Sequence, residues 1–87
     1  MAEENELEME QVRAVKSKYQ DLLMQKRNVV GVGIGLREVG GQITEQIALT
    51  VMVRKKYPFS QLHPHDVIPS ELDGVPVDVK EVGVFRI

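Results

Sequence analysis

The stretch that decides the fold runs from Asn28 to Leu36 and reads NVVGVGIGL. Its apolar residues alternate with glycines, which is the period of a β-strand. One face of the expected strand carries Val30, Val32, Ile34 and Leu36, and the opposite face carries Gly31, Gly33 and Gly35. Because glycine weakens a strand interior, three in alternation mark a twist or bulge, or a surface that another backbone, a second subunit or a flat ligand approaches closely.

The chain before Asn28 has a helical pattern. Between Glu6 and Arg27 there is neither Gly nor Pro, and strong helix formers dominate. Apolar residues recur at three- and four-residue steps and form one stripe of Val12, Val15, Tyr19, Leu22 and Leu23. We therefore expect a helix over residues 6–27, with Asn28 as its C-cap and residues 1–5 frayed.

Two more strands are expected after Leu36. Gly40-Gly41 supplies the positive φ values of a tight hairpin, and a second strand follows over residues 44–55. One face of this strand is Ile47, Leu49, Val51 and Val53, and the other is Gln46, Ala48, Thr50, Met52 and Arg54. Residues 57–74 are expected to be irregular, with helical turns at most from Ser60 and from Ser70. A turn at 73–74 leads into a third strand that begins at Val75, and residues 84–87 form a short extension or a loose tail.

These elements predict a single α+β domain over residues 1–87. We expect one long N-terminal helix packed on a small, mainly antiparallel three-stranded sheet. The helix stripe, Leu22 included, then covers the valine-rich face of the sheet, and the glycine face is left open.

Composition narrows the possible functions. The chain has 87 residues, no cysteine and a formal net charge of −2. The lack of cysteine excludes disulfides and thiolate metal sites, and the slight negative charge argues against nucleic-acid binding. No stretch approaches the roughly 20 apolar residues of a membrane span, and the acidic start is unlike a secretory signal. We therefore expect a cytoplasmic protein that binds neither nucleic acid nor membrane.

Four short motifs contain residue types that can bind ligands or catalyse reactions. The spacing of Gly31, Gly33 and Gly35 is G-x-G-x-G before a hairpin, whereas a dinucleotide site needs G-x-G-x-x-G before a helix. His63, His65 and Asp66 are weak candidates for a metal site, because neighbouring loop residues rarely close a tetrahedron. With Ser60 they contain the residue types of a hydrolytic triad without its scaffold. The basic cluster at 54–57 is expected to be a solubilising strand end.

Residues 28–82 resemble a segment that precedes the peptidase domain in bacterial proteins of the trypsin-like serine peptidase class. The resemblance lies in NVVGVGIG at 28–35, ALTVMVRKK at 48–56, IPSELDGVPVDV at 68–79 and EVG at 81–83. It implies an accessory N-terminal module in a bacterial protein. The chain has no Gly-Asp-Ser-Gly segment, so no catalytic residue is carried over.

The function expected from the sequence is that of a non-catalytic module that associates with itself or with a protein partner. The predicted interface is the glycine face, made of Gly31, Gly33, Gly35, Ala48, Thr50 and Met52. The alternative is a small-ligand or metal-binding domain that uses the glycine strand and the 63–66 loop. We expect no enzyme activity and no cofactor.

Overall fold

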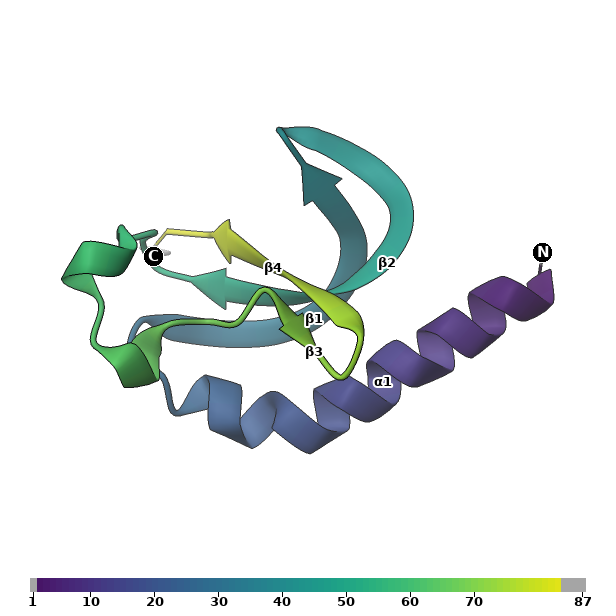
Figure 1. Cartoon of the computed structure of the whole chain (residues 1–87), viewed down its shortest axis with the longest axis horizontal. Coiled ribbons are helices and arrows are strands. Elements are labelled where there is room, and N and C mark those ends of the chain that lie inside the picture. Colours follow the sequence, from purple (N-terminus) through teal and green to yellow (C-terminus); the bar gives the residue numbers. More distant parts are fainter. Residues whose placement is uncertain (1, 84–87) are drawn as a thin grey trace, which may run out of the picture.

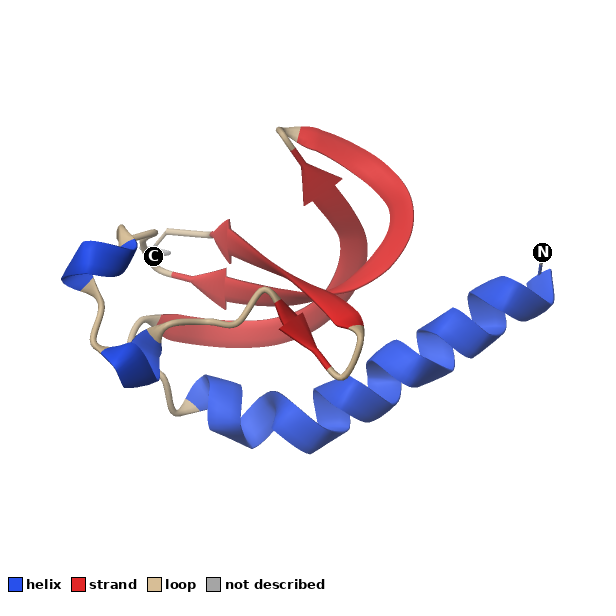
Figure 2. Cartoon of the chain, viewed as in Figure 1, coloured by secondary structure: helices blue, strands red, loops and turns tan. Residues whose placement is uncertain are grey.

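The computed structural model describes residues 2–83, which form one helix and a four-stranded sheet (Figure 2). Helix α1 (Ala2–Met24) lies across one face of the sheet. The strands are β1 (Val29–Val39), β2 (Gln42–Val53), β3 (Glu71–Leu72) and β4 (Val75–Glu81). The α+β class is confirmed. Met1 and residues 84–87, where the sequence predicts an extension or tail, lie outside the described residues.

The sheet differs from the predicted one in strand number and direction. Its order is β1-β2-β4-β3. β1 pairs with β2 antiparallel and β3 with β4 antiparallel, but β4 runs parallel to β2, with Leu49 opposite Val77 and Val53 opposite Glu81. The prediction of a mainly antiparallel three-stranded sheet was therefore wrong. The connection between β2 and β4 is long enough to bring β4 back in the same direction as β2.

The helix ends three residues before the predicted boundary. Its last α-type hydrogen bond runs from the Gln25 amide to the Asp21 carbonyl at 3.1 Å, and the Lys26 amide then bonds to Leu23 in a tighter turn. Asn28 adopts the left-handed conformation expected of it, with φ 75°. At the other end α1 already begins at Ala2, within the stretch that was predicted to fray.

The core lies between α1 and the valine-rich face of the sheet. Its buried residues are Val12, Val15, Leu23, Leu49, Val51, Val53, Val75 and Val77. Leu22, predicted to be part of this stripe, is 55% exposed, whereas Leu23 is 1% exposed. The stripe takes a four-residue step from Tyr19 to Leu23, because the helix turns 100° per residue and Leu22 falls to the side.

The β1–β2 hairpin is sharply curled and bends away from α1 (Figure 1). Gly40 (φ 58°) and Gly41 (φ 80°) make its two-residue turn as predicted. The β1–β2 register shifts between Val29 and Gly31 and again between Leu36 and Glu38. Such bulges bend a strand and increase its twist. Val30 and Leu36, predicted to lie on the face that α1 covers, are next to these bulges and are 43% and 52% exposed.

The segment between β2 and β4 is largely irregular, as predicted. It contains two short 3-10 helices, η1 (Phe59–Gln61) and η2 (Pro64–Asp66). Ser70 starts no helical turn, because the following residues form β3 and pair with β4. Asp73 (φ 50°) and Gly74 (φ 82°) make the predicted turn into β4. β2 spans residues 42–53 and not 44–55: it begins at Gln42, which pairs with Val39 across the turn, and after its end the Asn28 side chain hydrogen-bonds the backbone of Lys55. Within residues 2–83, no helix is both long and apolar enough to span a bilayer.

Candidate functional site

The six residues of the predicted interface lie together on the sheet face opposite α1. Gly31 is paired with Met52, Gly33 with Thr50 and Gly35 with Ala48. Paired residues of an antiparallel ladder project to the same side of the sheet. We call this surface the glycine face, and it consists of Gly31, Gly33, Gly35, Ala48, Thr50 and Met52.

Side chains of β2 already use part of the space that the glycines leave. A Cβ on Gly31 would lie 2.9 Å from the Met52 methyl group, and one on Gly33 would lie 3.6 Å from it. A Cβ on Gly35 would lie 3.1 Å from the Thr50 hydroxyl. Ala48 has no exposed surface. Met52 and Thr50 of the neighbouring strand β2 therefore occupy part of the space beside the glycines.

A cleft of about 700 Å³ lies beside one end of the glycine face, where Gly35 and Thr50 line it. The Glu38 amide, on the far half of β1, donates to Asp78 Oδ2 on β4 at 2.6 Å. The charged residues that line this cleft are Glu38, Lys56, Asp78 and Lys80, and the hairpin residues Leu36, Gly40, Gly41 and Ile43 and the β4 residues Val77 and Val79 complete the lining. Asp78 and Lys80 were not predicted from the sequence as site residues. They lie beside Thr50 and Met52 only because β4 pairs with β2 in the parallel direction. The alternation of Val75, Val77 and Val79 with Pro76, Asp78 and Lys80 was the available signal.

The 63–66 loop uses its polar groups to hold its own structure. His63 Nδ1 accepts a weak hydrogen bond from the His65 amide at 3.5 Å, and the two rings lie 4.1 Å apart between centroids. Asp66 Oδ1 accepts from the Arg27 amide at 2.9 Å. Across the part of the chain that the structure describes, no three His, Asp or Glu side chains gather in a group that could hold a metal ion.

A second cleft, of about 890 Å³, lies where the α1–β1 turn meets the end of β2 and the 3-10 helices. We call it the basic cleft, and its main lining residues are Arg27, Arg54, Tyr57, Ser60, His63 and Asp66. It brings the basic cluster at 54–57 beside the 63–66 loop. Ser60, His63 and Asp66 all line it, but within residues 2–83 no hydrogen bond joins any two of these side chains.

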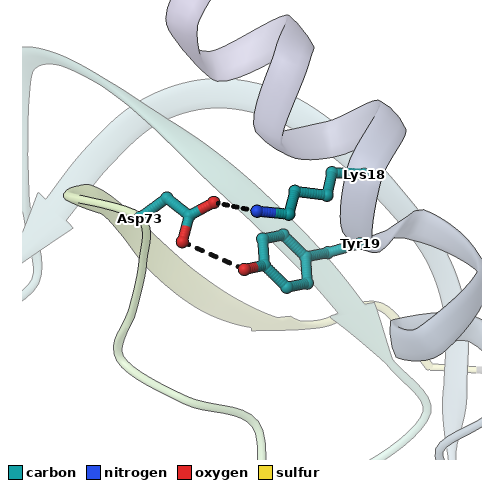
Figure 3. Close-up of polar contacts among 3 residues, drawn as sticks. All are labelled: Lys18, Tyr19 and Asp73. Carbon is teal, nitrogen blue, oxygen red and sulfur yellow. Dashed lines mark hydrogen bonds and ion pairs between the residues drawn. The ribbon is translucent and has the colours of Figure 1, made fainter.

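A third polar cluster fastens α1 to the β3–β4 turn (Figure 3). Asp73 accepts hydrogen bonds from Lys18 Nζ at 2.9 Å and from the Tyr19 hydroxyl at 3.0 Å. The hydrogen bond from Lys18, with that from Tyr19, holds the pKa of Asp73 below its ordinary value of 3.8. The hydrogen bond to Asp73 likewise raises the pKa of Lys18 above 10.5. All three residues are paired with one another, so this cluster has a structural role.

No protein-family profile matches the sequence, and no curated protein matches it.

Proposed function

We propose that this chain is a non-catalytic association module that forms a closed dimer through the outer edge of β1. The observation that carries the proposal is the open edge of this strand, which is uncharged from Val29 to Leu36. β1 stands at one end of the strand order, and within residues 2–83 no strand pairs with its outer side. The other edge strand, β3, is only two residues long.

β1 carries charged residues only at its far end, at Arg37 and Glu38. Edge strands are commonly guarded by charged side chains, prolines or bulges along their length. From Val29 to Leu36, β1 has no charged residue and no proline, and its register shifts lie only at the two ends of this stretch. Its unpaired backbone donors and acceptors are thus available to another strand.

The exposed side chains of β1 favour a second copy of this chain as the partner. Val30 and Leu36, both exposed, lie at equal distances from Gly33 in the sequence. An antiparallel pair of β1 strands around a two-fold axis at Gly33 places Val30 of each copy opposite Leu36 of the other. Each such cross-strand apolar pair contributes about 0.2–1 kcal/mol. The two-fold axis closes the assembly, because each edge is used once.

The glycine face has a supporting part in this proposal. Glycines at alternate positions leave one side of β1 without side chains, so a second sheet edge can approach without clashes on that side. We therefore expect Gly33→Glu, which adds a charge at the centre of the paired strands, to weaken the dimer and to leave α1 intact.

The oligomeric state in solution tests the proposal. Sedimentation velocity across a micromolar dilution series should show a shift from the monomer mass of 9.8 kDa to twice that value. Leu36→Lys should keep the chain monomeric, because it places a charge in the contact. Leu22→Lys is the matched control, since Leu22 on α1 is 55% exposed and Leu36 is 52% exposed. A wild-type chain that stays at 9.8 kDa throughout would contradict the proposal.

The resemblance of residues 28–82 to a segment before trypsin-like peptidase domains supports a narrower proposal. Under this narrower proposal, the chain is the accessory module of a bacterial peptidase system, and its dimer brings two peptidase units together. The genomic neighbourhood tests this directly. A peptidase gene or domain encoded immediately downstream is the expected result, and an unrelated neighbourhood argues against it.

A further inference from the structure

The basic cleft is held in shape by hydrogen bonds within its own walls. The Asn28 amide group donates to the Lys55 carbonyl, and Asn28 Oδ1 accepts from the Lys55 amide at 3.1 Å. These bonds fasten the α1–β1 turn to the end of β2. On the other side, Asp66 Oδ1 accepts from the Arg27 amide at 2.9 Å, and Lys26 Nζ donates to the His65 carbonyl at 2.5 Å. The cleft is thus organised before any ligand enters, which lowers the cost of binding.

The cleft has a net positive charge, because its two arginines outnumber its one carboxylate. Arg27 and Arg54 are both exposed and line the cleft. In the described part of the chain, the single salt bridge joins Lys18 to Asp73 and involves neither arginine. Asp66 is the one acidic residue among those that line the cleft, and its Oδ1 is bonded to a backbone amide. A chain with a net charge of −2 therefore concentrates unpaired guanidinium groups at one place.

We propose that the basic cleft binds a small organic anion that carries a phosphate or carboxylate group. A guanidinium group presents paired N–H donors that match the oxygens of either group. His63 Nδ1 accepts a weak hydrogen bond from the His65 amide, so Nε2 is the ring nitrogen that can donate to a ligand. The Ser60 hydroxyl, which also lines the cleft, adds another donor.

The cleft also has room and an apolar surface for the organic part of such a ligand. Its volume of about 890 Å³ lies within the range of small-molecule sites. The Tyr57 ring is 43% exposed. Lys55 Nζ lies 5.6 Å from the centroid of this ring, an arrangement that orients the ring and raises the positive charge beside it.

A titration of the full chain followed by ¹H–¹⁵N NMR tests the proposal. The probes are inorganic phosphate and succinate, each exchanged for sodium chloride at constant ionic strength. We expect saturable shifts confined to the amides of residues 26–30, 54–57 and 60–66. The Arg27→Gln/Arg54→Gln double variant should bind about tenfold more weakly or worse, since it loses two charge-assisted contacts. Both residues are exposed, so the variant should keep its fold, and its remaining amide shifts check this.

The control is Arg13→Gln/Arg37→Gln, which removes the same charge elsewhere and should bind as the wild type does. Saturation by phosphate alone identifies a phosphate ligand, and saturation by succinate alone identifies a carboxylate. Shifts that rise linearly over the whole surface, or an equal loss of binding in the control, would overturn the site. The titration is repeated on Leu36→Lys, so that a failure of the dimer and a failure of the anion site are observed separately.

Discussion

Two adjacent leucines on α1 provide the sharpest test of the packing. Leu23 is 1% exposed and lies in the core, whereas Leu22 is 55% exposed. Full burial of a leucine side chain stabilises a protein by about 1.5–3 kcal/mol. Truncation also leaves a cavity, so Leu23→Ala should lower the free energy of unfolding by about 2–5 kcal/mol. Leu22→Ala should cost less than about 1 kcal/mol, because it opens no cavity in the core.

Leu22→Ala is the matched control for Leu23→Ala. Both substitutions make the same change in helix propensity, so the difference between them reports burial alone. Urea unfolding followed by circular dichroism at one fixed protein concentration gives both values, and the fixed concentration removes any contribution from association. Equal losses in the two variants, or a larger loss in Leu22→Ala, would refute the assignment of Leu23 to the core.

Two further predictions concern turns. The low pKa of Asp73 means that its contacts with Lys18 and Tyr19 stabilise the fold fully above pH 3.8, and that this stabilisation is lost as the pH falls through the folded-state pKa. Asp73→Asn, which tolerates the same left-handed backbone, should have a lower urea midpoint than the wild type at pH 6, and the gap should close on acidification; a gap that is independent of pH contradicts the assignment. Gly41 has φ 80° whereas a Cβ on Gly33 meets only an ordinary contact at 3.6 Å. Gly41→Ala should therefore cost roughly 1 kcal/mol or more, and Gly33→Ala should be neutral or slightly stabilising in the monomer; thermal melts of the two variants decide this.

Local features of the fold could be predicted from the sequence where a short-range rule determines them. The alternation in β1 and β2, the Gly40-Gly41 turn and the left-handed Asn28 each follow from a few neighbouring residues. The stripe on α1 was predicted to within one residue at its end, because periodicity alone does not decide between Leu22 and Leu23. Packing against the sheet selects Leu23, which lies in the core.

Long-range features were not predictable in the same way. The valines of β4 indicated which face is buried, but nothing local indicates that the strand runs parallel to β2. β3 is two residues long, too short for any period to show. Among the candidate sites, the glycine face could be predicted, because apolar residues alternate with glycines in β1. The basic cleft could not be predicted from the sequence. Arg27, Arg54 and His63 line one cleft because the hydrogen bonds of Asn28 and Asp66 join segments that are distant in the sequence.

The parallel pairing of β2 with β4 has a consequence for the order of folding. The β1–β2 hairpin joins neighbouring segments, so its contacts form after closure of a very short loop. The β2–β4 contacts require closure of the whole connection from Val53 to Val75, which costs more chain entropy and is slower. We therefore expect β4 to join last, together with β3 as one small hairpin. We expect the same hairpin to detach as one unit, which exposes the core residues Val75 and Val77. When the β3–β4 hairpin detaches, the edge of β2 that pairs with β4 becomes a second free strand edge. With two free edges on each copy, the proposed dimer would extend into an open chain of paired sheets.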